Sequence, residues 1–143
     1  MNAMEISLSG LDVEWRRMEI CALNLANLGS TRAADGRPYV PLRLVSGPAE
    51  SFGSLLEANL QPQGLQPRGV RVQAIEGARG THQAYEPGHP DADAAGFVTY
   101  PDISQAEEMT LLLKSSRAYE ANLVALAAAQ QIYSSALQIG RQS

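Results

Sequence analysis

One short stretch, residues 85–93, holds most of the side chains that could do chemistry. His89, Asp91 and Asp93 are of the types that bind metal ions, so a hydrolytic metal site is one hypothesis. A rigid double turn is the alternative, because Pro-Gly and Pro-Asp are turn dipeptides and aspartates hydrogen-bond the nearby backbone. The turn is favoured, and we expect it to serve as an interface or a brace that uses Tyr85, Pro87, Gly88, His89, Pro90, Asp91 and Asp93.

Nothing else in the sequence supports catalysis. The chain has two histidines and one cysteine, Cys21, from which a nucleophile, a base and an orienting group cannot be assembled. It has no phosphate-binding loop, dinucleotide fingerprint or zinc-ligand spacing. Cys21 falls on the inner side of an amphipathic segment, where cysteine acts as a small hydrophobe. We therefore expect a protein that is not an enzyme, with no cofactor and no small-molecule substrate.

The charge of the chain argues against nucleic acid as a partner. Its 143 residues carry a net charge of -4, and the 11 lysines and arginines are scattered. The first twenty residues have several charges and no apolar core, so we expect no cleavable secretory signal.

The chain is organised around residues 104–139, which predict one helix of about 36 residues. Ser104 and Glu107 form a capping box, and Gly140 marks the other end. Apolar residues recur at alternating spacings of three and four, which is typical of a helix packed along a partner helix. No charged residue occurs from 121 to 140, so we expect this half to be covered on more than one side.

A second helix is predicted near the N-terminus, with Ser7 or Ser9 as possible caps and a stop at Leu28-Gly29. Its apolar residues follow the same rhythm, so the simplest architecture pairs the two terminal helices as an antiparallel coiled coil. An ordinary helical hairpin is the alternative. The predicted packing core is Leu11, Trp15, Met18 and Leu25 against Leu112, Tyr119, Leu123, Leu126, Tyr133 and Leu137.

The lengths of the two helices distinguish these architectures. The first spans at most about 24 residues, so pairing leaves about 12 residues of the second, or about 18 Å, without an internal partner. An apolar overhang of this kind requires another chain.

The middle of the chain predicts short strands at residues 37–45, 69–75 and 96–100. Between the first two lies an insertion, residues 46–68, predicted as a surface loop with a helical turn or two at 53–60. The fold class is therefore mainly α with a small β unit. The expected segments are an N-terminal helix at 1–30, a β-rich middle domain at 31–101 and a C-terminal helix at 102–143.

Two motifs carry a resemblance to a known family. Asn24-Leu25-Ala26-Asn27-Leu28-Gly29 resembles the N-terminal signature of bacterial flagellar rod and hook proteins, and Arg117-Ala118-Tyr119-Glu120-Ala121-Asn122 resembles their C-terminal signature. Together with residues 85–93, Gly96-Phe97-Val98, Pro101 and Glu108-Met109, they are similar to the proximal rod proteins of the flagellar basal body. The stretch 46–68 has no clear counterpart in that family.

The resemblance implies a structural subunit of the rod that crosses the periplasm, exported by the flagellar type III apparatus without signal cleavage. Its expected partners are copies of itself, other rod subunits, the membrane ring and rod–ring adaptor proteins. Asn24, Asn27, Arg117 and Asn122 are then expected to fix the register of packing. A cytoplasmic coiled-coil adaptor is the competing class, followed by the metal-dependent hydrolase.

Overall fold

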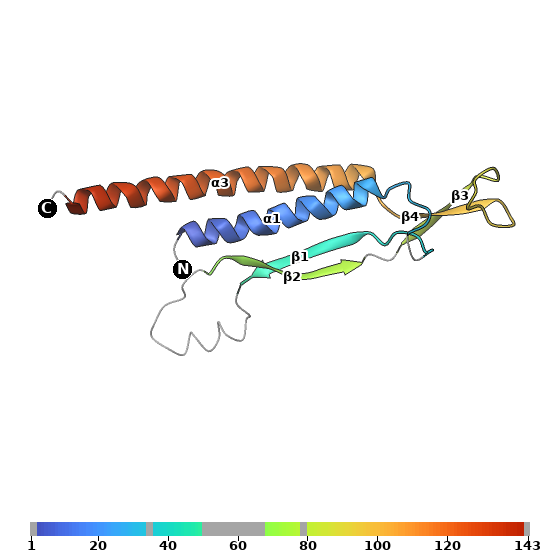
Figure 1. Cartoon of the computed structure of the whole chain (residues 1–143), viewed down its shortest axis with the longest axis horizontal. Coiled ribbons are helices and arrows are strands. Elements are labelled where there is room, and N and C mark those ends of the chain that lie inside the picture. The colour runs from blue at the N-terminus through green and yellow to red at the C-terminus, as the bar shows by residue number, and fades with distance from the viewer. Residues whose placement is uncertain (1–2, 34–35, 50–67, 78–79, 142–143) are drawn as a thin grey trace, which may run out of the picture. The chain divides into compact units, whose positions relative to one another are not determined.

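The computed structural model describes residues 3–33, 36–49, 68–77 and 80–141 (Figure 1). The elements follow one another as α1 (Ala3–Ala26), β1 (Leu42–Pro48), β2 (Val70–Gly77), β3 (Thr81–Tyr85), β4 (Phe97–Pro101) and α3 (Gln105–Arg141). A helix at each end with short strands between them confirms a mainly α chain with a small β unit. The helical turn expected at 53–60, and most of the insertion around it, lie outside the described residues.

α3 begins where the capping residues predict. The Glu107 N–H donates to the Ser104 hydroxyl at 3.4 Å, and Glu107 and Glu108 lie in the acidic first turn. The helix continues for 37 residues and includes Gly140, so it ends slightly beyond the expected stop. A glycine this close to a helix end costs too little to break it.

α1 begins earlier than its serines predict. The helix has 24 residues and starts at Ala3, so Ser7 and Ser9 lie inside it and do not cap it. Their hydroxyls instead donate to carbonyls of the preceding turn, Ser7 to Ala3 at 3.1 Å and Ser9 to Ile6 at 2.7 Å. A serine whose hydroxyl donates to a carbonyl three or four residues earlier can lie inside a helix as well as at its end.

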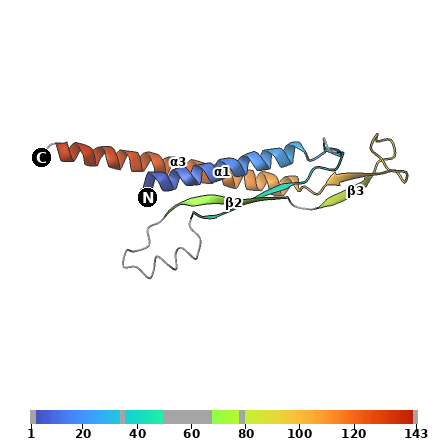
Figure 2. The same ribbon diagram turned by 60° about the horizontal axis from the view of Figure 1, so that its bottom comes forward.

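The strands form two two-stranded sheets, β1 with β2 and β3 with β4 (Figures 1 and 2). β3 and β4 are antiparallel, in register from Thr81 opposite Pro101 to Tyr85 opposite Phe97. β2 and β4 lie where the sequence predicts them. β1 does not start at residue 37: it runs from Leu42 to Pro48, because Pro38 and Pro41 lack the N–H that a strand pairing needs. The loop expected from residue 46 therefore begins later.

The chain divides into two compact units. Unit 1 contains Met1–Arg16, Ser46–Gln73 and Ser115–Ser143, and unit 2 contains Arg17–Val45 and Ala74–Lys114. Each unit draws on both terminal helices and on the middle of the chain.

α1 buries a different stripe from the predicted one. Its buried residues are Ser7, Gly10, Val13, Ile20, Cys21 and Asn24. The predicted core residues of α1 flank this stripe: Trp15 is exposed, and Leu11, Met18 and Leu25 are half-buried. Several buried positions are small or polar, and a pattern of large apolar residues therefore misses them. In unit 2 the apolar core also includes Leu44, Val98 and Ile103.

Candidate functional site

The predicted metal ligands in residues 85–93 are engaged in bonds within unit 2. His89 accepts a hydrogen bond at Nδ1 from the Asp91 N–H at 3.0 Å. The Asp91 carboxylate accepts a bond from the Thr31 hydroxyl at 2.8 Å and forms an ion pair with Arg32 at 2.9 Å. Asp91 therefore ties the turn to the segment that follows α1. Among the described residues, no group of three or more metal-ligating side chains comes together.

Asp93 fixes the second half of the same turn. One of its carboxylate oxygens, Oδ1, accepts the N–H of Ala95 at 2.9 Å and of Phe97 at 2.8 Å. Gly96 follows with a φ of +85°, a conformation that glycine adopts without strain. A Cβ at this position would lie 3.0 Å from the Tyr85 ring and 3.2 Å from the Pro87 Cβ. The chain therefore holds this turn in a defined shape.

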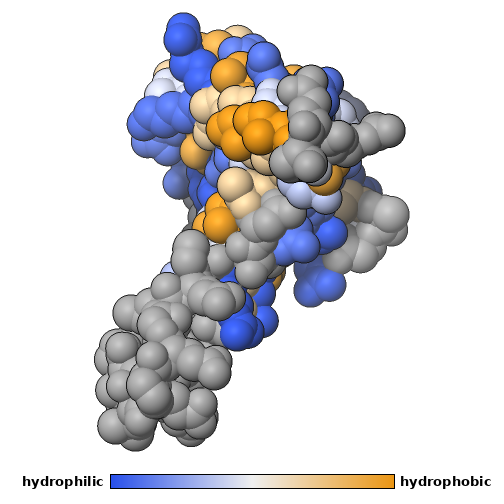
Figure 3. Space-filling model, turned by 90° about the vertical axis from the view of Figure 1, so that its left-hand side faces the viewer, coloured by the Kyte–Doolittle hydropathy of each residue, from blue (hydrophilic) through white to orange (hydrophobic). Residues whose placement is uncertain are grey.

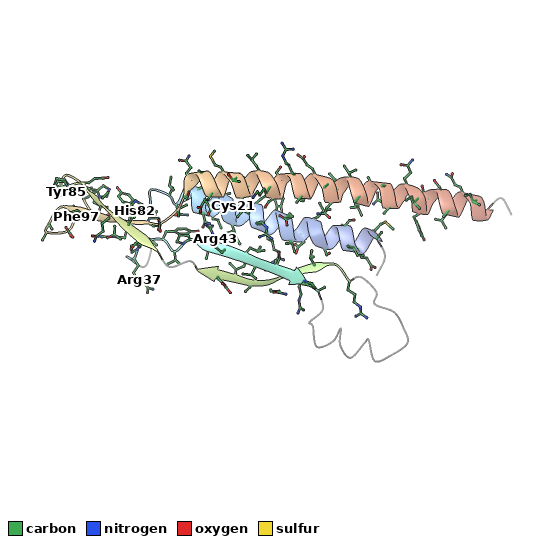
Figure 4. The ribbon with its side chains drawn as sticks, turned by 180° about the vertical axis from the view of Figure 1, so that it is seen from behind. Cys21, Arg37, Arg43, His82, Tyr85 and Phe97 are labelled. Carbon is green, nitrogen blue, oxygen red and sulfur yellow. The ribbon has the colours of Figure 1, made fainter. Side chains whose placement is uncertain are left out.

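The turn presents aromatic side chains to solvent. Tyr85 is 66% exposed and Phe97 is 39% exposed, and their rings meet edge to face with centroids 5.3 Å apart. Figure 4 shows both rings at the end of the β3–β4 hairpin, with His82 further along β3. We call Tyr85, Pro87 and Phe97 the aromatic knob. Gly88 and Pro90 are also exposed, whereas His89 and Asp91 are half-buried.

Behind the knob, Tyr100 braces the hairpin. Its ring stacks on His82 with centroids 5.7 Å apart, and its hydroxyl donates to the Glu86 carboxylate at 3.1 Å. Desolvation, and then the Glu86 carboxylate, raise the pKa of the Tyr100 phenol.

Asn24, predicted to fix the register of packing, is bonded to the first strand inside the chain. It has no exposed surface, and its side-chain amide donates to the Leu42 carbonyl and accepts the Leu42 N–H, both at 2.9 Å. Its oxygen also accepts the Tyr39 hydroxyl at 3.0 Å. Two turns earlier, Arg17 donates to the Leu44 carbonyl at 3.3 Å. Side chains of α1 thus bind the backbone of β1 as a neighbouring strand would.

A buried charged group, which the sequence did not indicate, lies beside Cys21. Glu108 is fully buried and forms an ion pair with Arg43 of β1 through one carboxylate oxygen; the other oxygen has no hydrogen-bond partner among the described residues. Burial, and then Glu108, raise the pKa of the Cys21 thiol from 9.0 to about 11. Desolvation and Glu108 also raise the pKa of Tyr39. Figure 4 labels Cys21 on α1 and Arg43 on β1.

The other three signature residues occupy different environments. Asn27 donates to the Leu23 carbonyl at 2.8 Å, and Asn122 donates to the Ala118 carbonyl at 2.9 Å. The Asn122 amide lies against Gly10 of α1, where a Cβ would approach it to 2.7 Å. Arg117 is exposed. Gly10 is therefore a position where α1 and α3 approach each other closely in unit 1.

Within unit 1, α1 and α3 run in opposite directions. Trp15 contacts Tyr119 with ring centroids 6.2 Å apart, Gly10 meets Asn122, and Met4 shares a pocket with Tyr133. That pocket has a volume of about 390 Å³ and an apolar lining of Ala3, Met4, Ala129, Ile132, Tyr133 and Ala136. Hydrophobic side chains are visible on the face viewed in Figure 3.

The second half of α3 is largely uncovered. Val124, Ile132 and Ile139 are 70%, 71% and 72% exposed. Of the predicted α3 core, Leu123, Tyr133 and Leu137 are exposed, and Leu112, Tyr119 and Leu126 are half-buried. A single chain therefore does not bury this helix. Neither described helix has a stretch long and apolar enough to cross a membrane.

Comparison with known proteins finds flagellar rod proteins among the similar sequences. Residues 94–139 match the family model described as flagellar basal body rod FlgEFG protein C-terminal. The flagellar basal-body rod protein FlgC of Bacillus subtilis is 36% identical over 98% of this chain and 97% of its own length. Proteins of the same name from Escherichia coli O6:H1 and Aquifex aeolicus are 32% and 33% identical, over 99% and 92% of this chain and 98% and 90% of their own lengths.

Proposed function

Because the chain belongs to the FlgC family of flagellar basal-body rod proteins, it is a structural subunit of that rod, and we propose that its terminal helices build it into the assembly. The observation that carries this proposal is the uncovered, charge-free second half of α3. Assembly removes its exposed apolar side chains from water without desolvating a charge.

We infer that the helices pair as an antiparallel coiled coil and that their lengths leave an overhang. α1 has 24 residues and α3 has 37, so 13 residues of α3 have no counterpart in α1. All residues from 131 to 140 are exposed. Burial of apolar surface is worth about 25 cal/mol per Å², so repeated contacts along a rod add up to a stable assembly. Four residues of the predicted packing core then pack against neighbouring subunits: Leu123, Leu126, Tyr133 and Leu137.

The same proposal covers location and partners. Copies of this chain and other rod subunits are the neighbours, and the membrane ring, the rod–ring adaptors and the type III export apparatus are the expected further partners. The rod segment lies in the periplasm, and the chain reaches it through the type III export apparatus. The role is mechanical and not enzymatic, which fits the engagement of His89, Asp91 and Asp93 in hydrogen bonds and an ion pair within unit 2.

Fractionation and deletion together test this function. A tagged chain should sediment with detergent-extracted basal bodies, whereas a cytoplasmic adaptor would stay in the soluble fraction. Electron microscopy of basal bodies from cells lacking the chain should show rings without a completed rod, and plasmid expression should restore it. Complete rods in the deletion strain would overturn the proposal.

A further inference from the structure

We propose that the aromatic knob of one chain inserts into the apolar pocket of a second copy of the same chain. The knob is Tyr85, Pro87 and Phe97 of unit 2, and the pocket lies between the start of α1 and the last turns of α3 in unit 1. This inference rests on the proposed function and adds a specific contact between copies.

The knob has the properties of an interaction anchor. Aromatic residues that are exposed yet held rigid lose little conformational entropy when they bind. Tyr85 and Phe97 are opposite one another in the β3–β4 register, and the turn between them is closed by backbone bonds from Glu86 to Gly96 at 2.9 Å and from Asp93 to Phe97 at 2.9 Å. Tyr85 is nonetheless 66% exposed.

The pocket matches the knob in size and chemistry. Its 390 Å³ exceed the volume of one aromatic side chain, and alanines at three of its six lining positions make the hollow. No side chain that lines the pocket carries a charge. An aromatic ring is therefore a better occupant than a charged or strongly polar group, which would lose its water there without a partner.

The size of the contact determines when it forms. Each aromatic ring buries at most about 150–250 Å², so knob and pocket together fall well below the 1,200–2,000 Å² of a stable interface. The contact should leave a dilute chain monomeric and should form only where the terminal helices already hold copies together. Because knob and pocket are different surfaces, the contact is heterologous, and its repetition gives a ring or an open helical series, of which a rod uses the second, and not a two-fold dimer.

Disulfide crosslinking in intact basal bodies tests the contact. The variant carries Tyr85→Cys and Ile132→Cys, and native Cys21 remains because it is fully buried. We expect oxidation to convert this chain from a monomer band into a ladder of its own multimers. The matched control pairs Tyr85→Cys with Val124→Cys, an equally exposed position outside the pocket lining, and should remain monomeric. Each single-cysteine variant should also remain monomeric.

Several results would overturn the contact while leaving the proposed function intact. These are rods that contain the variant without a ladder, an equal ladder in the control, crosslinks only to other proteins, or a crosslink within one chain. If the cysteine pair does not enter rods, Phe97→Cys with Ala136→Cys replaces it, and failure of both pairs while each single variant assembles also counts against the contact. Absence of the wild-type chain from basal bodies would instead refute the proposed function.

Discussion

Arg43, on β1, forms an ion pair with Glu108, in the first turn of α3, and the Glu108 carboxylate has no exposed surface. The pair joins the start of the long helix to the first strand inside unit 2. Burying a carboxylate is costly unless it is paired, so this contact selects one arrangement of the two elements.

Breaking this pair should destabilise the chain more than replacing both partners. We expect Arg43→Met to lower the free energy of unfolding by about 3 kcal/mol, because it leaves Glu108 buried and unpaired. Arg43→Met with Glu108→Leu should lose less than the sum of the single changes. Urea unfolding at pH 7 measures both, and Arg16→Ala, which removes an exposed pair with Asp12, should cost under about 1 kcal/mol. Additive losses at Arg43 and Glu108 would contradict this account.

Asn24 should be intolerant of substitution because it satisfies backbone groups of β1. Asn24→Ala leaves the N–H and carbonyl of Leu42 without their side-chain partners, and we expect a loss of about 2–3 kcal/mol in unfolding free energy. Asn24→Asp should also destabilise, since a carboxylate cannot donate to the Leu42 carbonyl. Asn27→Ala, which removes one bond from the residue after α1 to the Leu23 carbonyl in its last turn, is the matched control and should cost under about 1 kcal/mol. Equal losses for Asn24→Ala and Asn27→Ala would show that the two bonds between Asn24 and the Leu42 backbone do not stabilise the chain.

The close approach at Gly10 predicts that a glycine-to-alanine change, which usually stabilises a helix, destabilises this one. Alanine normally stabilises a helix interior by about 0.5–1 kcal/mol relative to glycine. Here Gly10→Ala should destabilise, because the new Cβ meets the Asn122 amide at 2.7 Å, and the amide can move away only by giving up its hydrogen bond to the Ala118 carbonyl. In an Asn122→Ala background the same change should stabilise. Thermal unfolding of the four proteins checks this, and stabilisation by Gly10→Ala in both backgrounds would show that the helices do not approach closely.

Cys21 should be chemically protected in the folded chain. Burial and Glu108 hold its pKa near 11, so at pH 8 the thiol is both inaccessible and protonated. Labelling by a thiol reagent should be slow and should accelerate with urea. A Cys21→Ser, Gln83→Cys variant, with its thiol on exposed β3, should label at once. Native labelling as fast as in the unfolded chain would be inconsistent with this environment.

The raised pKa of Cys21 also makes the stability of the folded chain depend on pH. In the folded chain the pKa of Cys21 is raised from 9.0 to about 11. The free energy of unfolding should therefore keep its full Cys21 contribution below pH 9 and lose it as the pH rises from 9 through about 11, because the unfolded thiol ionises first. Cys21→Ser should remove this contribution, and the difference between the two stability profiles isolates it from the tyrosines.

The sequence predicted the features that depend on local signals. Ser104 and Glu107 mark the start of α3, and alternation marks β4. The stripe buried by α1 was missed because Ser7, Gly10 and Asn24 carry no apolar signal, and their burial depends on contacts distant in sequence. Glu108 lies in the first turn, where the helix dipole alone would favour an acidic residue, whereas its burial depends on Arg43, 65 residues away. β3 has a polar sequence and was missed because its pairing with β4 defines it.

The central claim, that exposed apolar residues of α3 are covered by neighbouring subunits, is tested most directly by the amount of Ile132→Asp in purified basal bodies. Ile132 is 71% exposed in the single chain, so the change should leave the monomer's unfolding free energy within about 0.5 kcal/mol of wild type. In the assembly it would bury an unpaired charge, so we expect the variant to be absent from basal bodies and the cells to be non-motile. Ile132→Val, and Gln83→Asp on exposed β3, should assemble normally. Wild-type amounts of Ile132→Asp in complete rods would contradict the claim.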